Sequence, residues 1–261
     1  MKILVIPDCQ VKPGVATDHL TWAGEAICDY RPDVVINIGD FADMPSLSTH
    51  DKAGSKYFEG KRYKDDIASA QLGMKKLLKP LRDLQATQKI NKHKVYKPRM
   101  ILTMGNHENR INRAVANTPM LEGVISTDDL NYQKDWEVYE FLKPVFINGV
   151  GFCHYFPVGA MGRPASSASV LVNKLHMSCI AGHQQGKQNH RCANGHNIGF
   201  KQVGRHTSTI ANVIADIVSD RRRVAGVILR NICFNLTHEV SADVRSLGKY
   251  TTAQTRKDRN Q

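Results

Sequence analysis

The amino-acid sequence predicts an α/β fold, and three features of its first half indicate this. Short apolar runs at residues 3–6, 34–38 and 100–104 each lead into a polar loop, as buried strands do. The segment from Asp18 to Ile27 has the spacing of a helix, and the breaker at residues 31–33 ends it. A strand, a helix and a second strand in this order indicate a βαβ unit with a parallel sheet.

The next elements follow from periodicity. Residues 46–64 are polar and predict a long loop. Residues 65–89 have helical periodicity, with a kink expected at Pro80. A further helix, carrying Ile111 and Val115, should follow the strand at 100–104.

The second half predicts shorter elements. Strands are expected at residues 136–139, 145–147, 151–153 and 177–181, with a helix at 165–175. Asn148-Gly149 predicts a two-residue hairpin turn. In the last third, apolar spacing of three and four favours a helix over residues 207–218, and residues 224–232 predict a strand.

Composition limits the class of protein. The chain has 261 residues, 41% of them apolar, which suits one large domain or a domain with an extension. No apolar run reaches the length of a membrane span, so no membrane partner is expected. The six cysteines form no C-x-x-C pair and do not resemble a disulfide framework, so a reducing cytoplasm is the simpler expectation.

Positive charge is concentrated near the end of the chain. Residues 187–261 carry thirteen Lys or Arg and five Asp or Glu, so +8 of the net charge of +12 lies there. A basic region of this kind suits nucleic acid or another polyanion, and it equally suits a solvated surface.

Polar residues follow the predicted strands at the points where the strands end. They are Asp8, Asp40, Asn106 with His107, His154 and His183. Ligands bind at this edge of open α/β sheets. Carboxylates, imidazoles and an amide suit divalent ions such as Mn²⁺, Fe²⁺ or Zn²⁺. A pair of such ions can hold a phosphoryl group and activate water.

These residues form an ordered motif set. In sequence order the motifs are Asp8-Cys9-Gln10, Gly39-Asp40, Gly105-Asn106-His107-Glu108, Cys153-His154 and Gly182-His183-Gln184-Gln185. The set resembles that of calcineurin-like metallophosphoesterases over residues 1–186. Residues 40–63 are most similar to small phosphoesterases of tailed bacteriophages, which would place the protein in the host cytoplasm.

The resemblance implies a four-layer α/β/β/α fold, a β-sandwich flanked by helices, with residues 1–186 as the metallophosphoesterase core. Residues 187–247 would complete the fold, as further strands of the second sheet, or form a divergent subdomain. Residues 248–261 are polar and basic and predict a disordered tail.

The resemblance also implies a role for each site residue. Asp40 would bridge two metals, and Asn106, His154 and His183 would complete the second metal site. Asp8 would belong to the first site. His107 would bind no metal and would assist the leaving group, which makes His107, Asn106 and Asp40 the catalytic set.

The chain departs from the family at the first metal site. Two family histidines are replaced by Gln10 and Gln185. A glutamine oxygen binds Zn²⁺ more weakly than imidazole does, so this site should favour Mn²⁺ or Mg²⁺ or be lost. We therefore expect one or two divalent ions, manganese first, with magnesium, iron, nickel and zinc as alternatives.

Two arginines follow the Asn-His-Glu turn. Arg110 and Arg113 could hold a substrate phosphate, because guanidinium groups match phosphate oxygens. The alternative is an exposed basic helix face.

The sequence thus predicts a metal-dependent hydrolase of phosphoesters that uses metal-activated water. The basic charge favours a phosphodiesterase or nuclease, or a nucleotide phosphoesterase. Two alternatives remain: a phosphomonoesterase acting on proteins or small molecules, and a weakened fold that binds nucleic acid.

Overall fold

The structure is a computed structural model that describes residues 1–49, 55–56, 59–184, 188–191, 198–201, 211–220, 223–225 and 230–233. Its strands are β1 (Lys2–Ile6), β2 (Val34–Asn37), β3 (Arg99–Thr103), β4 (Glu137–Tyr139), β5 (Val145–Ile147), β6 (Val150–Cys153), β7 (Ser178–Ala181), β8 (Gln188–Arg191), β9 (Ile198–Lys201), β10 (Ala211–Asp220), β11 (Arg223–Ala225) and β12 (Arg230–Cys233). Its α-helices are α1 (Asp18–Tyr30), α2 (Tyr63–Ile90), α3 (Arg110–Asn117) and α4 (Ala168–Leu175). Five 3-10 turns complete the described elements: η1 (Pro45–Leu47), η2 (Pro119–Leu121), η3 (Thr127–Leu130), η4 (Tyr132–Lys134) and η5 (Ala160–Gly162).

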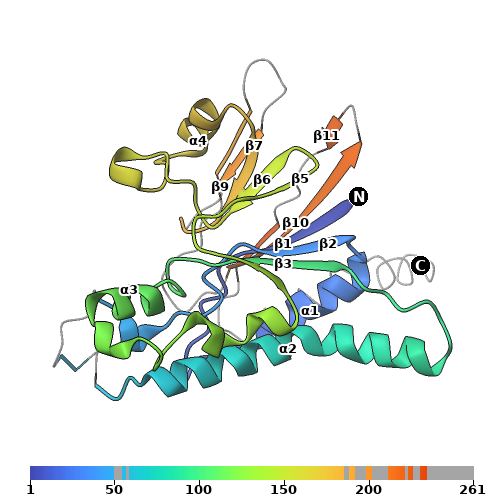
Figure 1. Cartoon of the computed structure of the whole chain (residues 1–261). Coiled ribbons are helices and arrows are strands. Elements are labelled where there is room, and N and C mark those ends of the chain that lie inside the picture. Colours follow the sequence, from blue (N-terminus) through green and yellow to red (C-terminus); the bar gives the residue numbers. More distant parts are fainter. Residues whose placement is uncertain are drawn as a thin grey trace, which may run out of the picture.

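The strands form two sheets, which Figure 1 shows one above the other. The first has the order β11-β10-β1-β2-β3-β4, with β12 also paired to β10. Strands β1 to β4 run parallel. The second sheet has the order β5-β6-β7-β9-β8, with β6, β7 and β9 parallel. The predicted βαβ unit is therefore confirmed.

Successive side chains of β1 point to opposite faces of the first sheet, as in any strand, and so belong to two different apolar layers. Ile3 and Val5 pack between the sheets with residues such as Phe152. Leu4 and Ile6 face the opposite side and pack against α1 and α2. A third apolar cluster joins β7 of the second sheet to α4. The order helix, sheet, sheet, helix confirms the four-layer sandwich (Figure 1).

Helices α1 and α2 meet at a close contact that requires glycine. A Cβ atom at Gly24 would lie 2.2 Å from the carbonyl oxygen of Leu77 and 2.9 Å from a ring carbon of Pro80. Helix α2 continues through Pro80 as a single helix of 28 residues. The contact fixes α1 against α2 beneath the first sheet.

The hairpin at Asn148-Gly149 is confirmed. Both residues have positive φ, 49° and 77°, as the favoured two-residue turn requires. The turn joins β5 to β6, which pair antiparallel.

The helix expected over residues 207–218 is wrong. Residues 211–220 form β10, which pairs antiparallel with β1, so that Leu4 lies opposite Asp216. A strand inside a sheet need not alternate apolar and polar residues, so its spacing mimicked a helix. The single strand expected over 224–232 is two strands, β11 and β12, which both pair with β10.

The C-terminal strands only partly follow expectation. Strands β8 and β9 extend the second sheet as predicted, whereas β10, β11 and β12 belong to the first. The tail at 248–261 lies outside the described residues. Within the described chain, no helix combines the length and apolar character needed to cross a membrane.

Candidate metal centre and active site

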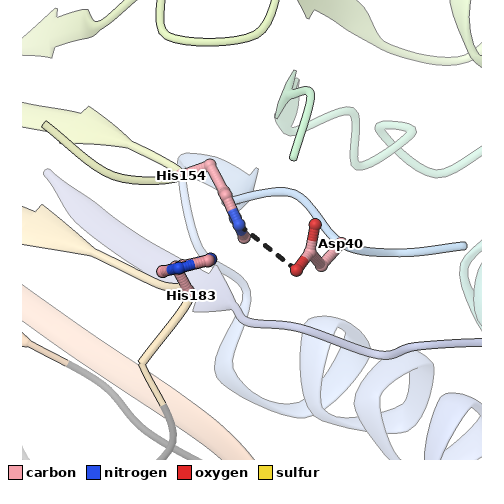
Figure 2. A group of neighbouring side chains, drawn as sticks. All are labelled: Asp40, His154 and His183. Atoms are coloured by element: carbon pink, nitrogen blue, oxygen red, sulfur yellow. Dashed lines mark ion pairs between the residues drawn. The ribbon is translucent and has the colours of Figure 1, made fainter. Parts of the chain in front are cut away.

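The predicted ligands come from both sheets and meet at one edge of the sandwich. Asp40 follows β2, Asn106 follows β3, His154 follows β6 and His183 follows β7. Donor atoms of Asp40, His154 and His183 all lie within 4.8 Å of one another. Figure 2 shows both imidazoles beside the carboxylate of Asp40.

Hydrogen bonds fix the tautomer of His154. Its Nδ1 lies 2.9 Å from the backbone oxygen of Ile38, which can only accept, so Nδ1 carries the hydrogen. Its Nε2 lies 3.2 Å from Oδ2 of Asp40 and 2.9 Å from Oδ1 of Asn106. Three lone-pair atoms therefore converge, which is stable only with a proton or a cation among them.

His183 extends this group. Its Nδ1 lies 2.6 Å from Oδ1 of Asn106. A carboxylate, an amide oxygen and two imidazoles in contact match the ligands of a borderline divalent ion, and the backbone bond of His154 is the outer support such ligands have. The residues present fit a metal at this second site.

The pKa values show how strongly these groups interact. Burial opposes ionisation of Asp40, but His154 and His107 together outweigh burial and lower the pKa of Asp40 to about 2. Burial likewise opposes a charge on His154, and Asp40 and Asp8 together outweigh it and raise the pKa of His154 to about 9. A divalent ion among these ligands would displace that proton.

The described residues of the first metal site are Asp8 and Gln10. Asp8 lies outside the group of three, and its Oδ2 accepts a hydrogen bond from the backbone N–H of His183 at 3.1 Å. Burial raises the pKa of Asp8 to about 7. Gln10 has a positive φ of 46° and lines the adjoining cleft. Gln185 lies outside the described residues.

His107 has a hydrogen-bond partner that the sequence analysis did not name. Its Nδ1 lies 2.7 Å from Oδ1 of Asp43, and because a carboxylate only accepts, Nδ1 carries the hydrogen. Its Nε2 faces Asp40 at 3.6 Å. Although burial opposes it, the bond to Asp43 raises the pKa of His107. The spacing Asp40-x-x-Asp43 is the signal that could have identified this partner.

The two arginines lie in different surroundings. Arg110 is buried and donates to the backbone oxygen of Asp43 at 2.7 Å, so it does not belong to an exposed helix face. It also lines the cleft, with Nη2 3.5 Å from Nε2 of His107. Arg113 is exposed and is absent from the residues that line this cleft.

Glu108 organises the loops under the site. One oxygen accepts the N–H groups of Asp40 and Gly105 at 3.1 and 2.9 Å, and the other accepts that of Ala42 at 2.9 Å. Gly105 has no room for a side chain, because a Cβ there would lie 2.1 Å from Oδ1 of Asp40. Glu108 therefore holds the loops that carry Asp40 and Asn106 through three backbone hydrogen bonds.

A cleft of about 970 Å³ opens beside the ligands. Its lining includes Asp40, Asn106, His107 and His183, together with basic residues. The basic residues are Lys12, Lys61, Arg62 and Arg110. The cysteines next to ligands do not take part, since Cys9 and Cys153 are buried and burial raises the pKa of both thiols.

Comparison with known proteins agrees with this geometry. The family model for calcineurin-like phosphoesterases matches residues 1–203, and the chain belongs to that family. Yfce, a phosphoesterase from E. coli of known structure, is 13% identical, with 88% of this chain and 100% of that chain covered at a TM-score of 0.34. No curated protein matches. The chain is accordingly a metal-dependent phosphoric ester hydrolase.

Proposed function

We propose that this hydrolase acts on phosphodiesters of the nucleotide or nucleic-acid type, with manganese as its preferred metal. The observation that carries the proposal is the position of His107 beside the ligand group, in the wall of a large cleft that four lysine and arginine side chains line together with acidic residues. A diester needs an acid for its alkoxide leaving group and room for a second substituent.

The roles of the residues follow from their contacts. Asp40, Asn106, His154 and His183 would hold a metal, which when bound polarises the phosphoryl group and makes water a better nucleophile. His107 lines the cleft, and Asp43 holds its ring through Nδ1, so Nε2 is the nitrogen that would serve the leaving group. As water attacks phosphorus and the bond to the leaving oxygen breaks, His107 gives its proton to that oxygen.

The size of the cleft and its lysine and arginine side chains support a diester. A volume of about 970 Å³ exceeds the need of a small phosphomonoester, and lysine and arginine side chains suit further phosphate groups. Gln10 offers an amide oxygen where the family has imidazole, which favours Mn²⁺ over Zn²⁺ at the first site.

A substrate panel tests the proposal. The metal-stripped chain is supplied in turn with Mn²⁺, Mg²⁺, Ni²⁺ and Zn²⁺ and assayed on bis-p-nitrophenyl phosphate and p-nitrophenyl phosphate. We expect turnover of the diester, fastest with Mn²⁺ and abolished by EDTA. Turnover of the monoester alone would establish a phosphomonoesterase, and no turnover together with salt-sensitive DNA binding would establish a binding module.

A further inference from the structure

Lys12 is a cation fixed at the active site that the metal chemistry does not account for. It lies two residues after Gln10, in the loop that follows β1. Its Nζ contacts Oδ2 of Asp43 at 2.8 Å, and its side chain is 36% exposed. Lys12 lines the same cleft as Gln10, Asn106 and His107. Its charge therefore faces the space where a phosphoester must sit.

One carboxylate holds both Lys12 and the acid. Asp43 uses Oδ1 for Nδ1 of His107 and Oδ2 for Nζ of Lys12. Two hydrogen bonds to one carboxylate thus connect the ammonium of Lys12 to the ring of His107. An ammonium has three N–H donors, and the bond to Asp43 uses one, which leaves donors for a phosphate oxygen.

Lys12 and Arg110 are both cations in contact with Asp43. Nζ of Lys12 lies 2.8 Å from Oδ2 of Asp43, and Arg110 lies 3.6 Å from Oδ1. Acidic residues of the cleft lining offset the charge of its lysines and arginines, so its positive charge is local. An ammonium in a partly closed cleft attracts an anion to its own side of the cleft.

We propose that Lys12 is a substrate-binding residue that contacts the phosphoryl group of the ester, held in position by Asp43. This inference rests on phosphoester hydrolysis at this site and adds a residue for it. It also fits the altered first metal site, because a fixed ammonium two residues from Gln10 supplies positive charge on the side where the metal ligands are weaker.

The test measures the binding of inorganic phosphate. Phosphate contains the group that Lys12 would bind, and its binding can be measured without turnover. Calorimetry gives the Kd of phosphate for the full chain loaded with Mn²⁺. Loss of a hydrogen bond to a charged group should weaken binding by roughly tenfold or more in Lys12→Ala, with Lys12→Arg recovering most of it. The matched control is Lys76→Ala, which removes a lysine–aspartate contact of the same 2.8 Å length from the α1–α2 interface.

Steady-state kinetics on a phosphoester distinguish two roles of Lys12, binding of the phosphoryl group and positioning of Asp43. Lys12→Ala should raise KM, and the inhibition constant of phosphate should rise with it. A lysine that only positions Asp43 would lower kcat and leave phosphate binding unchanged. A phosphate Kd within about twofold of wild type in a folded Lys12→Ala variant would overturn the inference, even if diester hydrolysis were established. Weaker phosphate binding would support it even if the preferred ester proved to be a monoester.

Discussion

His107 and His154 are both buried imidazoles at the same sheet edge, and their hydrogen bonds give them different roles. Each ring is fixed through Nδ1, by the carboxylate of Asp43 in His107 and by the backbone oxygen of Ile38 in His154. The free nitrogen of His154 then points among the oxygens of Asp40 and Asn106. That of His107 lies 3.6 Å from Oδ2 of Asp40 and 3.5 Å from Nη2 of Arg110, and His107 lines the cleft.

This difference predicts the behaviour of His107→Ala. The variant should keep its metal, because no ligand is removed, and should lose about 100-fold or more in kcat, the usual contribution of a positioned acid. Metal analysis and steady-state kinetics measure the two effects. His93→Ala, which removes an exposed histidine just after α2 that does not line the cleft, is the control. Stoichiometric loss of metal from His107→Ala would show that His107 is a ligand.

Some site residues were predictable from sequence and others were not. Asp40, Asn106, His154 and His183 each follow a strand within three residues, so motif order was enough to bring them together. Lys12 and Asp43 contact each other across two loops, and Asp40 itself has a positive φ of 50°. The spacing Asp40-x-x-Asp43 could have indicated Asp43, but no pattern of residue types encodes the loop conformations that bring Lys12 to it, so this contact required the structure.

The buried residue His19 links stability to pH. Burial, reinforced by Lys76, lowers the pKa of His19 from 6.5 to about 4. The unfolded chain therefore takes up a proton at a higher pH than the folded chain does. Stability should fall as pH drops from about 6.5 to about 4, by on the order of 3 kcal/mol from this group alone.

Denaturant unfolding at several pH values measures this effect. The fall in the free energy of unfolding between pH 6.5 and 4 should be smaller in His19→Leu than in wild type, while His93→Leu should follow wild type. Equal pH dependence in wild type and His19→Leu would refute the assignment.

At the scale of elements, sequence periodicity predicted those helices and strands whose conformation depends on residues nearby in the sequence. Helices α1 and α2 have one buried face, and β1 to β3 are short apolar runs. Strand β10 was mistaken for a helix because its state depends on pairing with β1, a partner about two hundred residues away in sequence. Local spacing carries no information about that pairing.

The contact between α1 and α2 predicts a sharp effect of Gly24→Ala. The added Cβ would lie 2.2 Å from a backbone oxygen, which cannot move aside as a side chain could. We expect roughly 2 kcal/mol or more of destabilisation, measured by denaturant unfolding. Glu25→Ala, at the next and exposed position of α1, should change stability little. Equal stability of the two variants would show that the helices separate readily.

At the scale of the whole molecule, the sandwich explains why the site exists. Asp40 and Asn106 come from the first sheet, and His154 and His183 from the second, so neither sheet alone carries a complete ligand set. Packing of Ile3, Val5 and Phe152 between the sheets brings the two edges into contact. The four-layer order was predictable through the family motifs, whereas the membership of β10 to β12 in the first sheet was not.

The central claim is that ligands from both sheets hold the metal on which phosphoester hydrolysis depends. Its most direct test is the Mn²⁺ content and bis-p-nitrophenyl phosphate turnover of folded His154→Ala, measured beside wild type and His93→Ala. We predict that His154→Ala loses a bound ion and at least about 100-fold in turnover, while His93→Ala matches wild type. A His154→Ala variant with the metal content and turnover of wild type would contradict the claim.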